Sequence, residues 1–76
     1  MRDAIEMIVK ALVDDSETVD IREVEQRGAT LIEVRVAAND VGKIIGKQGR
    51  TIRALRSLAR IGGSKKNRRY LLEIVE

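Results

Sequence analysis

The residues best suited to chemistry lie between positions 41 and 69, where the chain has ten basic residues and no acidic one. These are Lys43, Lys47, Arg50, Arg53, Arg56, Arg60, Lys65, Lys66, Arg68 and Arg69. The first 40 residues hold ten acidic and five basic residues, so the net charge of +3 conceals two segments of opposite sign. An uninterrupted basic segment in a nearly neutral chain is typical of a surface that binds a polyanion.

Within this segment, Gly46-Lys47-Gln48-Gly49 has a glycine at each end. Glycine adopts backbone angles that other residues avoid and leaves the main chain accessible to a ligand. The helix expected next begins with N–H groups that lack partners inside the helix and favour an anion. The loop therefore suits phosphate, although glycines alone also fit a simple joint between two helices. The spacing matches neither a Walker A loop nor the dinucleotide-binding pattern.

The helix expected from about Arg50 to Arg60 has two distinct faces. At 100° per residue, its apolar residues form one stripe, made of Ile52, Leu55, Leu58 and Ala59. Arg53, Arg56 and Arg60 fall together on a separate face. Because guanidinium groups are planar and always charged, this second face suits phosphate groups.

Periodicity predicts the elements that position these residues. An amphipathic helix is expected over residues 3–13, and strands over 19–26 and 30–37 joined at Arg27-Gly28-Ala29 as an antiparallel hairpin. Glu23-Val24 breaks the alternation of the first strand, which predicts a bulge or a strand end there. Asn39 or Asp40 is expected to cap a short helix over 41–45. Gly62-Gly63 should stop the long helix, with a polar loop over 64–67 and a last strand over 69–75.

This order, α-β-β-α-α-β, predicts one α+β domain over residues 1–76, with a three-stranded sheet covered on one face by three helices. The chain has no cysteine or histidine, and no carboxylate lies in the basic segment. We therefore expect no metal, no cofactor and no catalysis. The apolar runs are too short to span a membrane and residues 1–10 lack a signal-peptide pattern, so we expect a cytoplasmic protein.

Residues 41–55, VGKIIGKQGRTIRAL, closely resemble the signature of the KH domain, in which an apolar pair precedes Gly-x-x-Gly and an isoleucine follows it. The element order resembles the type II arrangement of bacterial KH proteins, and the resemblance covers the whole chain. The chain is thereby similar to the single-domain, KhpA-like RNA-binding family. In KH domains this loop contacts about four nucleotides of single-stranded backbone.

The resemblance makes Gly46 and Gly49 the hinges of the loop and Lys47 and Gln48 its exposed tip. Ile44, Ile45 and Ile52 would be divided between the core and the floor of an apolar groove. The opposite wall would be the last strand near 68–70, and the loop over 64–67 would extend the phosphate track. The expected RNA-binding residues are Lys43, Ile45, Gly46, Lys47, Gln48, Gly49, Arg50, Arg53, Lys65, Lys66 and Arg68.

The resemblance also implies partners. Single-stranded RNA is the expected ligand, and nothing in the sequence discriminates against single-stranded DNA. The family resemblance implies an RNA chaperone or post-transcriptional regulator, linked in some bacteria to cell shape and cell-wall homeostasis. It further implies a homodimer or a heterodimer with a larger KH-containing RNA-binding protein. The alternative is an interaction module in which protein contact is primary and RNA contact is secondary.

Overall fold

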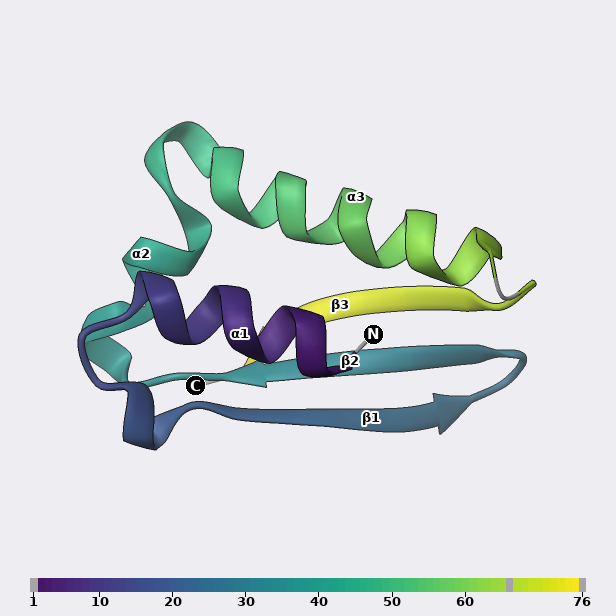
Figure 1. Cartoon of the computed structure of the whole chain (residues 1–76), viewed down its shortest axis with the longest axis horizontal. Helices are drawn as coiled ribbons and strands as arrows, with labels where there is room; N and C mark the ends of the chain where they lie inside the picture. The colour runs from purple at the N-terminus through teal and green to yellow at the C-terminus, as the bar shows by residue number, and fades with distance from the viewer. Residues whose placement is uncertain (1, 66, 76) are drawn as a thin grey trace.

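The element order of the computed structural model, which describes residues 2–65 and 67–75, is the one predicted from the sequence. Its helices and strands are α1 (Arg2–Leu12), β1 (Asp20–Gln26), β2 (Ala29–Arg35), α2 (Val41–Ile45), α3 (Arg50–Lys65) and β3 (Arg69–Val75). The helices lie on one face of a three-stranded sheet (Figure 1), which confirms the predicted α+β layers. Short 3₁₀ turns precede β1, α2 and α3, at Ser16–Thr18, Ala38–Asp40 and Lys47–Gly49.

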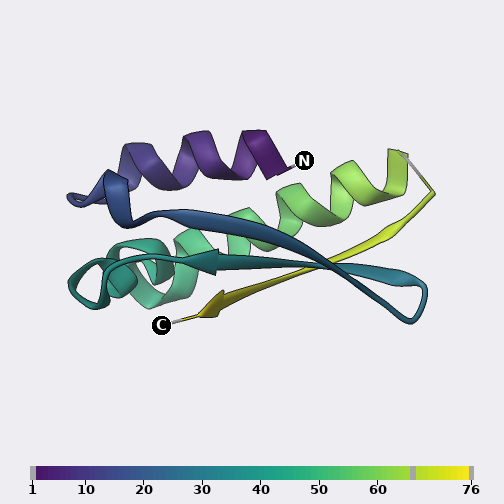
Figure 2. The same ribbon diagram turned by 90° about the horizontal axis from the view of Figure 1, so that it is seen from below.

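The sheet has the order β1-β2-β3, with β1 antiparallel and β3 parallel to the central β2. Strands β1 and β2 pair one to one from Asp20 opposite Arg35 to Gln26 opposite Ala29, so the bulge or strand end predicted at Glu23-Val24 is wrong. Beyond Ile21 the residues of β1 are exposed, so apolar alternation is not required there. In Figure 2, seen from below, the strands cross in front of α3 and α1 lies along one side of them.

The core lies between the sheet and the helices, as the periodic apolar residues predict. Ile32 and Val34 of the central strand are fully buried, and so are Ile5 and Val9 of α1. Fully burying such a side chain contributes roughly 1.5–3 kcal/mol. The rest of the buried cluster consists of Ile21, Val36, Ile44, Ile52, Leu55, Ala59 and Leu72. The apolar stripe of α3 therefore packs on the sheet, and its arginine face is left exposed.

Helix α3 does not stop at Gly62-Gly63, as the sequence predicted, but continues to Lys65. Gly63 is buried against the start of β3, where a Cβ atom would lie 2.5 Å from the Arg68 carbonyl oxygen and 2.7 Å from Tyr70 Cδ2. This glycine permits close packing inside the helix. The helix ends instead where Asn67 adopts a φ of 58° and the Arg68 amide donates to the Gly63 carbonyl at 2.8 Å. The predicted loop over 64–67 is correspondingly shorter, since Ser64 and Lys65 are helical.

Asp40, one of the two expected residues, is the N-cap of α2, but its side chain makes no capping hydrogen bond to this helix. Asp40 lies in the 3₁₀ turn, and its carboxylate, only 3% exposed, accepts the amides of Asp15 at 3.0 Å and Asp14 at 3.3 Å. Lys43 Nζ lies 3.4 Å from the same carboxylate. Asp40 therefore ties the chain after α1 to the start of α2.

These contacts predict an acid-sensitive stability. The Asp15 amide, and after it the Asp14 amide and Lys43, hold the pKa of Asp40 below its ordinary value, against an opposing effect of burial. A lowered pKa stabilises the fold above the unfolded-state value of about 3.9, and that contribution is lost as the pH falls through the folded-state pKa. The test is therefore the melting temperature, measured from about pH 7 to about pH 2.5. Below about pH 4, the melting temperature of Asp40→Asn should fall less than that of the unmodified chain. Parallel curves for the two proteins would contradict this role of Asp40.

Candidate nucleic-acid interface

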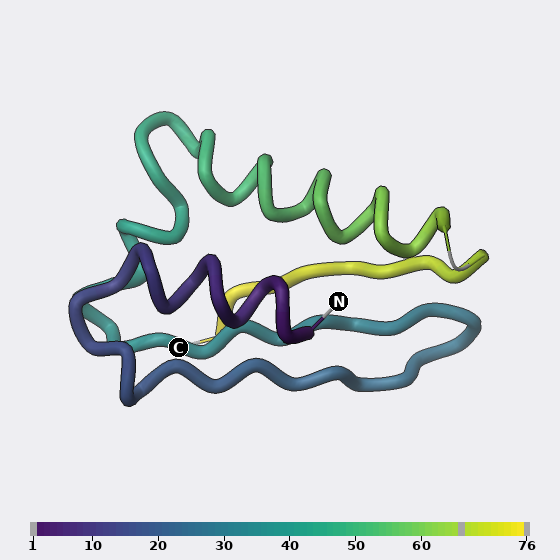
Figure 3. Tube along the Cα trace, viewed as in Figure 1, coloured from purple at the N-terminus to yellow at the C-terminus, as the bar shows by residue number. Residues whose placement is uncertain are grey.

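The loop Gly46–Gly49 has a backbone that demands glycine at its first position. Gly46 has φ 76° and ψ 173°, and a Cβ atom there would lie 2.7 Å from Thr51 Cβ and 2.9 Å from the Thr51 amide nitrogen. Gln48 and Gly49 also have positive φ values, 57° and 74°. Such angles are unfavourable for residues with a Cβ, so the loop is held in a specific shape. Figure 3 shows it as a sharp turn between α2 and α3, at the opposite end of the molecule from the β1–β2 hairpin.

Some of the amides at the entry to α3 are already paired. The Gly49 amide donates to the Gly46 carbonyl at 3.1 Å, and the Arg50 amide donates to the Lys47 carbonyl. The amides of Lys47 and Gln48 donate to no acceptor in the described part of the chain. Both residues are exposed. The tip of the loop therefore presents two backbone donors that suit an anion.

Arg53 fixes the shape of this tip. Its guanidinium donates to the Gln48 carbonyl at 2.7 Å and, through Nε, to the Gly49 carbonyl at 3.2 Å. Two carbonyl oxygens that would repel an anion are thus bonded to a cation. Arg53 was predicted as an RNA-binding residue, and the structure gives it a positioning role in the loop as well.

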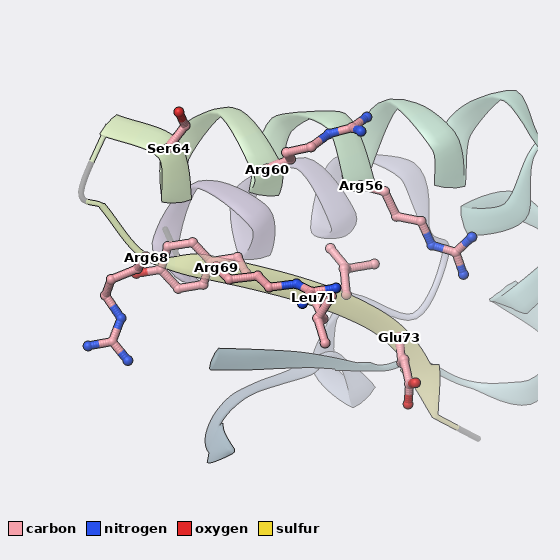
Figure 4. A pocket seen from close by; sticks show the side chains of 9 residues that line it. Arg56, Arg60, Ser64, Arg68, Arg69, Leu71 and Glu73 are labelled. Atoms are coloured by element: carbon pink, nitrogen blue, oxygen red, sulfur yellow. The ribbon is translucent and has the colours of Figure 1, made fainter. Parts of the chain in front are cut away.

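A groove runs from the loop along the edge of the sheet, between α3 and β3. The part next to the loop is lined by Ile45, Ile52, Arg56, Glu73 and Ile74. The adjoining part shares Arg56 and Glu73 and is further lined by Arg60, Ser64, Arg68, Arg69, Tyr70, Leu71 and Leu72. Figure 4 shows Arg56 and Arg60 projecting from α3 opposite Arg69 and Leu71 of β3. The groove thus combines an apolar floor with a wall of guanidinium groups.

The three isoleucines of the signature have separate places. Ile44 is fully buried in the core, and Ile52 is 8% exposed with one edge on the groove. Ile45 is 41% exposed and lines the groove beside Arg56. Only Ile45 is therefore mainly a groove residue, which agrees with its place in the predicted site.

Two predicted site residues are held by carboxylates. Lys43 is paired with Asp14 and Asp40, and the hydrogen bond from Lys43 to Asp14 is the main cause of its raised pKa. Arg68 donates to both carboxylate oxygens of Glu25, at 2.7 and 2.5 Å, and to the Thr30 hydroxyl at 2.7 Å. Thr30 and Arg68 together lower the pKa of Glu25. The charges of Lys43 and Arg68 are thus largely neutralised by protein groups.

The remaining predicted cations are differently placed. Lys47, Arg50 and Lys65 are exposed, and none of them forms an ion pair within residues 2–65 and 67–75. Lys66, also predicted to contact RNA, lies outside the described residues. Lys65 is at the end of α3 farthest along the chain from the loop, so the positive surface extends along the whole helix.

The predicted site set lacked several residues that the fold brings to the groove. Arg56 and Arg60 were identified only as a separate arginine face of the long helix, and Arg69 only as part of the opposite wall. Leu71 and Glu73 were not identified at all, because the resemblance placed only residues 68–70 of the last strand in the opposite wall. In the structure β3 is an edge strand of the sheet, and the groove along it reaches Glu73.

Other kinds of site find no support in the described residues. Over 2–65 and 67–75, no three His, Cys, Asp or Glu side chains are grouped so that they could hold a metal ion. None of the helices in these residues has the length and apolar character needed to cross a membrane.

Comparison with known proteins assigns the chain to a family. A model of the KhpA/KhpB KH domain matches residues 2–74. The chain is 47% identical over 72 residues to the RNA-binding protein KhpA of Borreliella burgdorferi, covering 95% of this chain and 88% of that protein. It is 46% identical to the RNA-binding protein KhpA of Chlamydia caviae and 42% identical to that of Aquifex aeolicus, in each case over 76 residues and the whole chain, and over 97% and 96% of those proteins. No solved structure gives a significant match. The chain therefore belongs to the KhpA/KhpB family of KH domains.

Proposed function

We propose that this chain binds single-stranded RNA in the groove between α3 and β3, with the loop Gly46–Gly49 on the sugar–phosphate backbone. The observation that supports this most strongly is the pair of amides at Lys47 and Gln48, which donate to no acceptor among the described residues at the end of a cationic groove. Several relatives at 42–47% identity bear the name RNA-binding protein. A KH domain loop of this type contacts about four nucleotides.

The free cations indicate where the phosphates would lie. Arg56, Arg60 and Arg69 line the groove and form no ion pair within the described residues. Lys47 and Arg50 continue this positive surface to the loop. Since Lys43 and Arg68 already bind carboxylates, we propose that these two residues support the fold. The cations that contact the phosphates are then Lys47, Arg50, Arg56, Arg60 and Arg69.

The apolar residues of the groove indicate where the bases would lie. Ile45, Ile52 and Ile74 line the part beside the loop, and the only aromatic residue of the chain, Tyr70, is half-buried farther along. Bases would therefore contact aliphatic side chains more than an aromatic platform. A duplex cannot place its bases on this floor, because its base edges face each other, so the groove favours a single strand.

The salt dependence of binding tests this proposal. Contacts to about four single-strand phosphates give a slope near roughly −2.8 when the logarithm of the association constant is plotted against that of salt concentration. Affinity for an eight-nucleotide RNA, measured by fluorescence anisotropy, should fall roughly 50-fold between about 50 and 200 mM salt. A blunt-ended duplex of the same RNA with its complement is the control and should bind more weakly. A flat salt response, or stronger binding of the duplex, would contradict the proposal.

With only about four nucleotides held, such a site recognises at most a very short sequence, which suits an RNA chaperone or post-transcriptional regulator. Pairing with a second copy or with a larger KH-containing protein is the second candidate, because a domain that holds only about four nucleotides gains affinity when two such sites are linked. Light scattering with and without RNA distinguishes RNA binding from protein pairing. A dimer that forms without RNA and binds no RNA would favour protein contact as the primary function.

A further inference from the structure

Glu73 is the one carboxylate among the described residues that line the two parts of the groove, and it lines both of them. It lies toward the end of β3, while Arg68 and Arg69 lie at its start (Figure 4). Glu73 is exposed and forms no ion pair with any described residue. Its charge is therefore not neutralised by the arginines across the groove.

A carboxylate at this place is incompatible with a phosphate. The phosphates would lie on the side of α3, where Arg56 and Arg60 project, and the bases would extend across β3 toward Glu73. A carboxylate accepts hydrogen bonds and donates none, so it favours a base edge with an amino group and disfavours one with a carbonyl oxygen. Glutamate accepts in this way from the N4 amino group of cytosine.

We propose that Glu73 is a specificity-determining residue that selects a base with an exocyclic amino group, and that it therefore favours cytosine over uracil. This role rests on the proposed RNA-binding function. Cytosine and uracil have nearly the same shape. At position 4 cytosine has an amino donor, whereas uracil has a carbonyl oxygen that would face the carboxylate. The preference therefore arises from the hydrogen bond and from repulsion of the wrong base.

Fluorescence anisotropy with eight-nucleotide oligocytidine and oligouridine tests this at one salt concentration. The unmodified chain should bind oligocytidine roughly tenfold more tightly. In Glu73→Gln the ratio should fall to within about twofold, mainly through tighter binding of oligouridine, because an amide can either donate or accept. Glu73→Ala should likewise lose the preference, since no acceptor remains.

Glu33→Gln is the matched control. Glu33 is the register partner of Glu73 on β2 and does not line the groove, so this variant changes the net charge equally and should keep the tenfold ratio. If Glu73→Gln tightens both oligonucleotides by the same factor, or leaves the ratio unchanged, the role of Glu73 is overturned. If the unmodified chain binds neither oligonucleotide, the proposed RNA-binding function itself fails.

Discussion

Replacing Lys47 and Gln48 together with aspartate is expected to weaken binding of a single-stranded octamer by roughly 50-fold or more at about 100 mM salt. The change removes one cation and puts two anions beside the only amides that the loop offers to a phosphate. Melting should stay within a few degrees, because both side chains are exposed and aspartate tolerates the positive φ of Gln48. Fluorescence anisotropy and thermal melting measure the two effects.

The control for this variant makes a matched change of charge elsewhere. Lys10 of α1 and Ser16, in the turn before β1, are exposed and do not line the groove, so Lys10→Asp with Ser16→Asp changes the net charge equally. This control should lose only a few-fold in affinity through the weaker overall field. Equal losses in the two double variants would show that net charge, and not the loop, determines binding.

Gly46→Ala should be among the most destabilising single substitutions in the chain. The new Cβ would meet the Thr51 side chain and amide, with Cβ–Cβ and Cβ–N distances of 2.7 and 2.9 Å, and alanine disfavours the φ of 76°. A positive φ costs roughly 1–2 kcal/mol and overpacking roughly 1–3 kcal/mol, so we expect a loss of about 2–5 kcal/mol in the free energy of unfolding. For a domain of this size that lowers the melting temperature by more than roughly 10 °C.

Two neighbouring glycines make this prediction specific. A Cβ at Gly42 of α2 would meet nothing within 4 Å, and Gly42→Ala should leave stability unchanged or slightly raised. Gly49 has a φ of 74° with no close contact, so Gly49→Ala should be destabilised only by its unfavourable backbone angle. In urea unfolding, the loss of unfolding free energy should be largest for Gly46→Ala, smaller for Gly49→Ala and smallest for Gly42→Ala. An equal effect of all three would mean that the Thr51 contact does not constrain the loop.

The features that short-range sequence patterns determine were predicted correctly. The apolar repeats placed α1, α3 and the strands, because burial on one face imposes a period on the residues of that face. The two faces of α3 follow from the same argument: Leu55 and Ala59 are buried, and Arg56 and Arg60 are exposed. The glycine loop was located from its two glycines, which adopt backbone angles that other residues avoid, together with the resemblance of residues 41–55 to the KH signature.

The features that the sequence did not indicate are contacts between residues far apart in the chain. Lys43 is neutralised by Asp14, 29 residues away, and Arg68 by Glu25, 43 residues away. Gly63 was taken for a helix stop because its close contact with β3 has no local signature. Glu73 was missed because its place beside α3 depends on the parallel pairing of β2 with β3. In each case the tertiary arrangement decides what the residue does.

In the proposed complex a single strand lies in the groove between α3 and β3 with its phosphates at the Lys47 and Gln48 amides. A titration of the ¹⁵N-labelled protein with an eight-nucleotide RNA, following the backbone amides by NMR, tests this arrangement. We expect the largest shifts at Lys47 and Gln48, with smaller shifts along Arg56, Arg60 and Arg69 and none at the β1–β2 hairpin. Largest shifts on β1 with the Lys47 and Gln48 amides unmoved would contradict this arrangement.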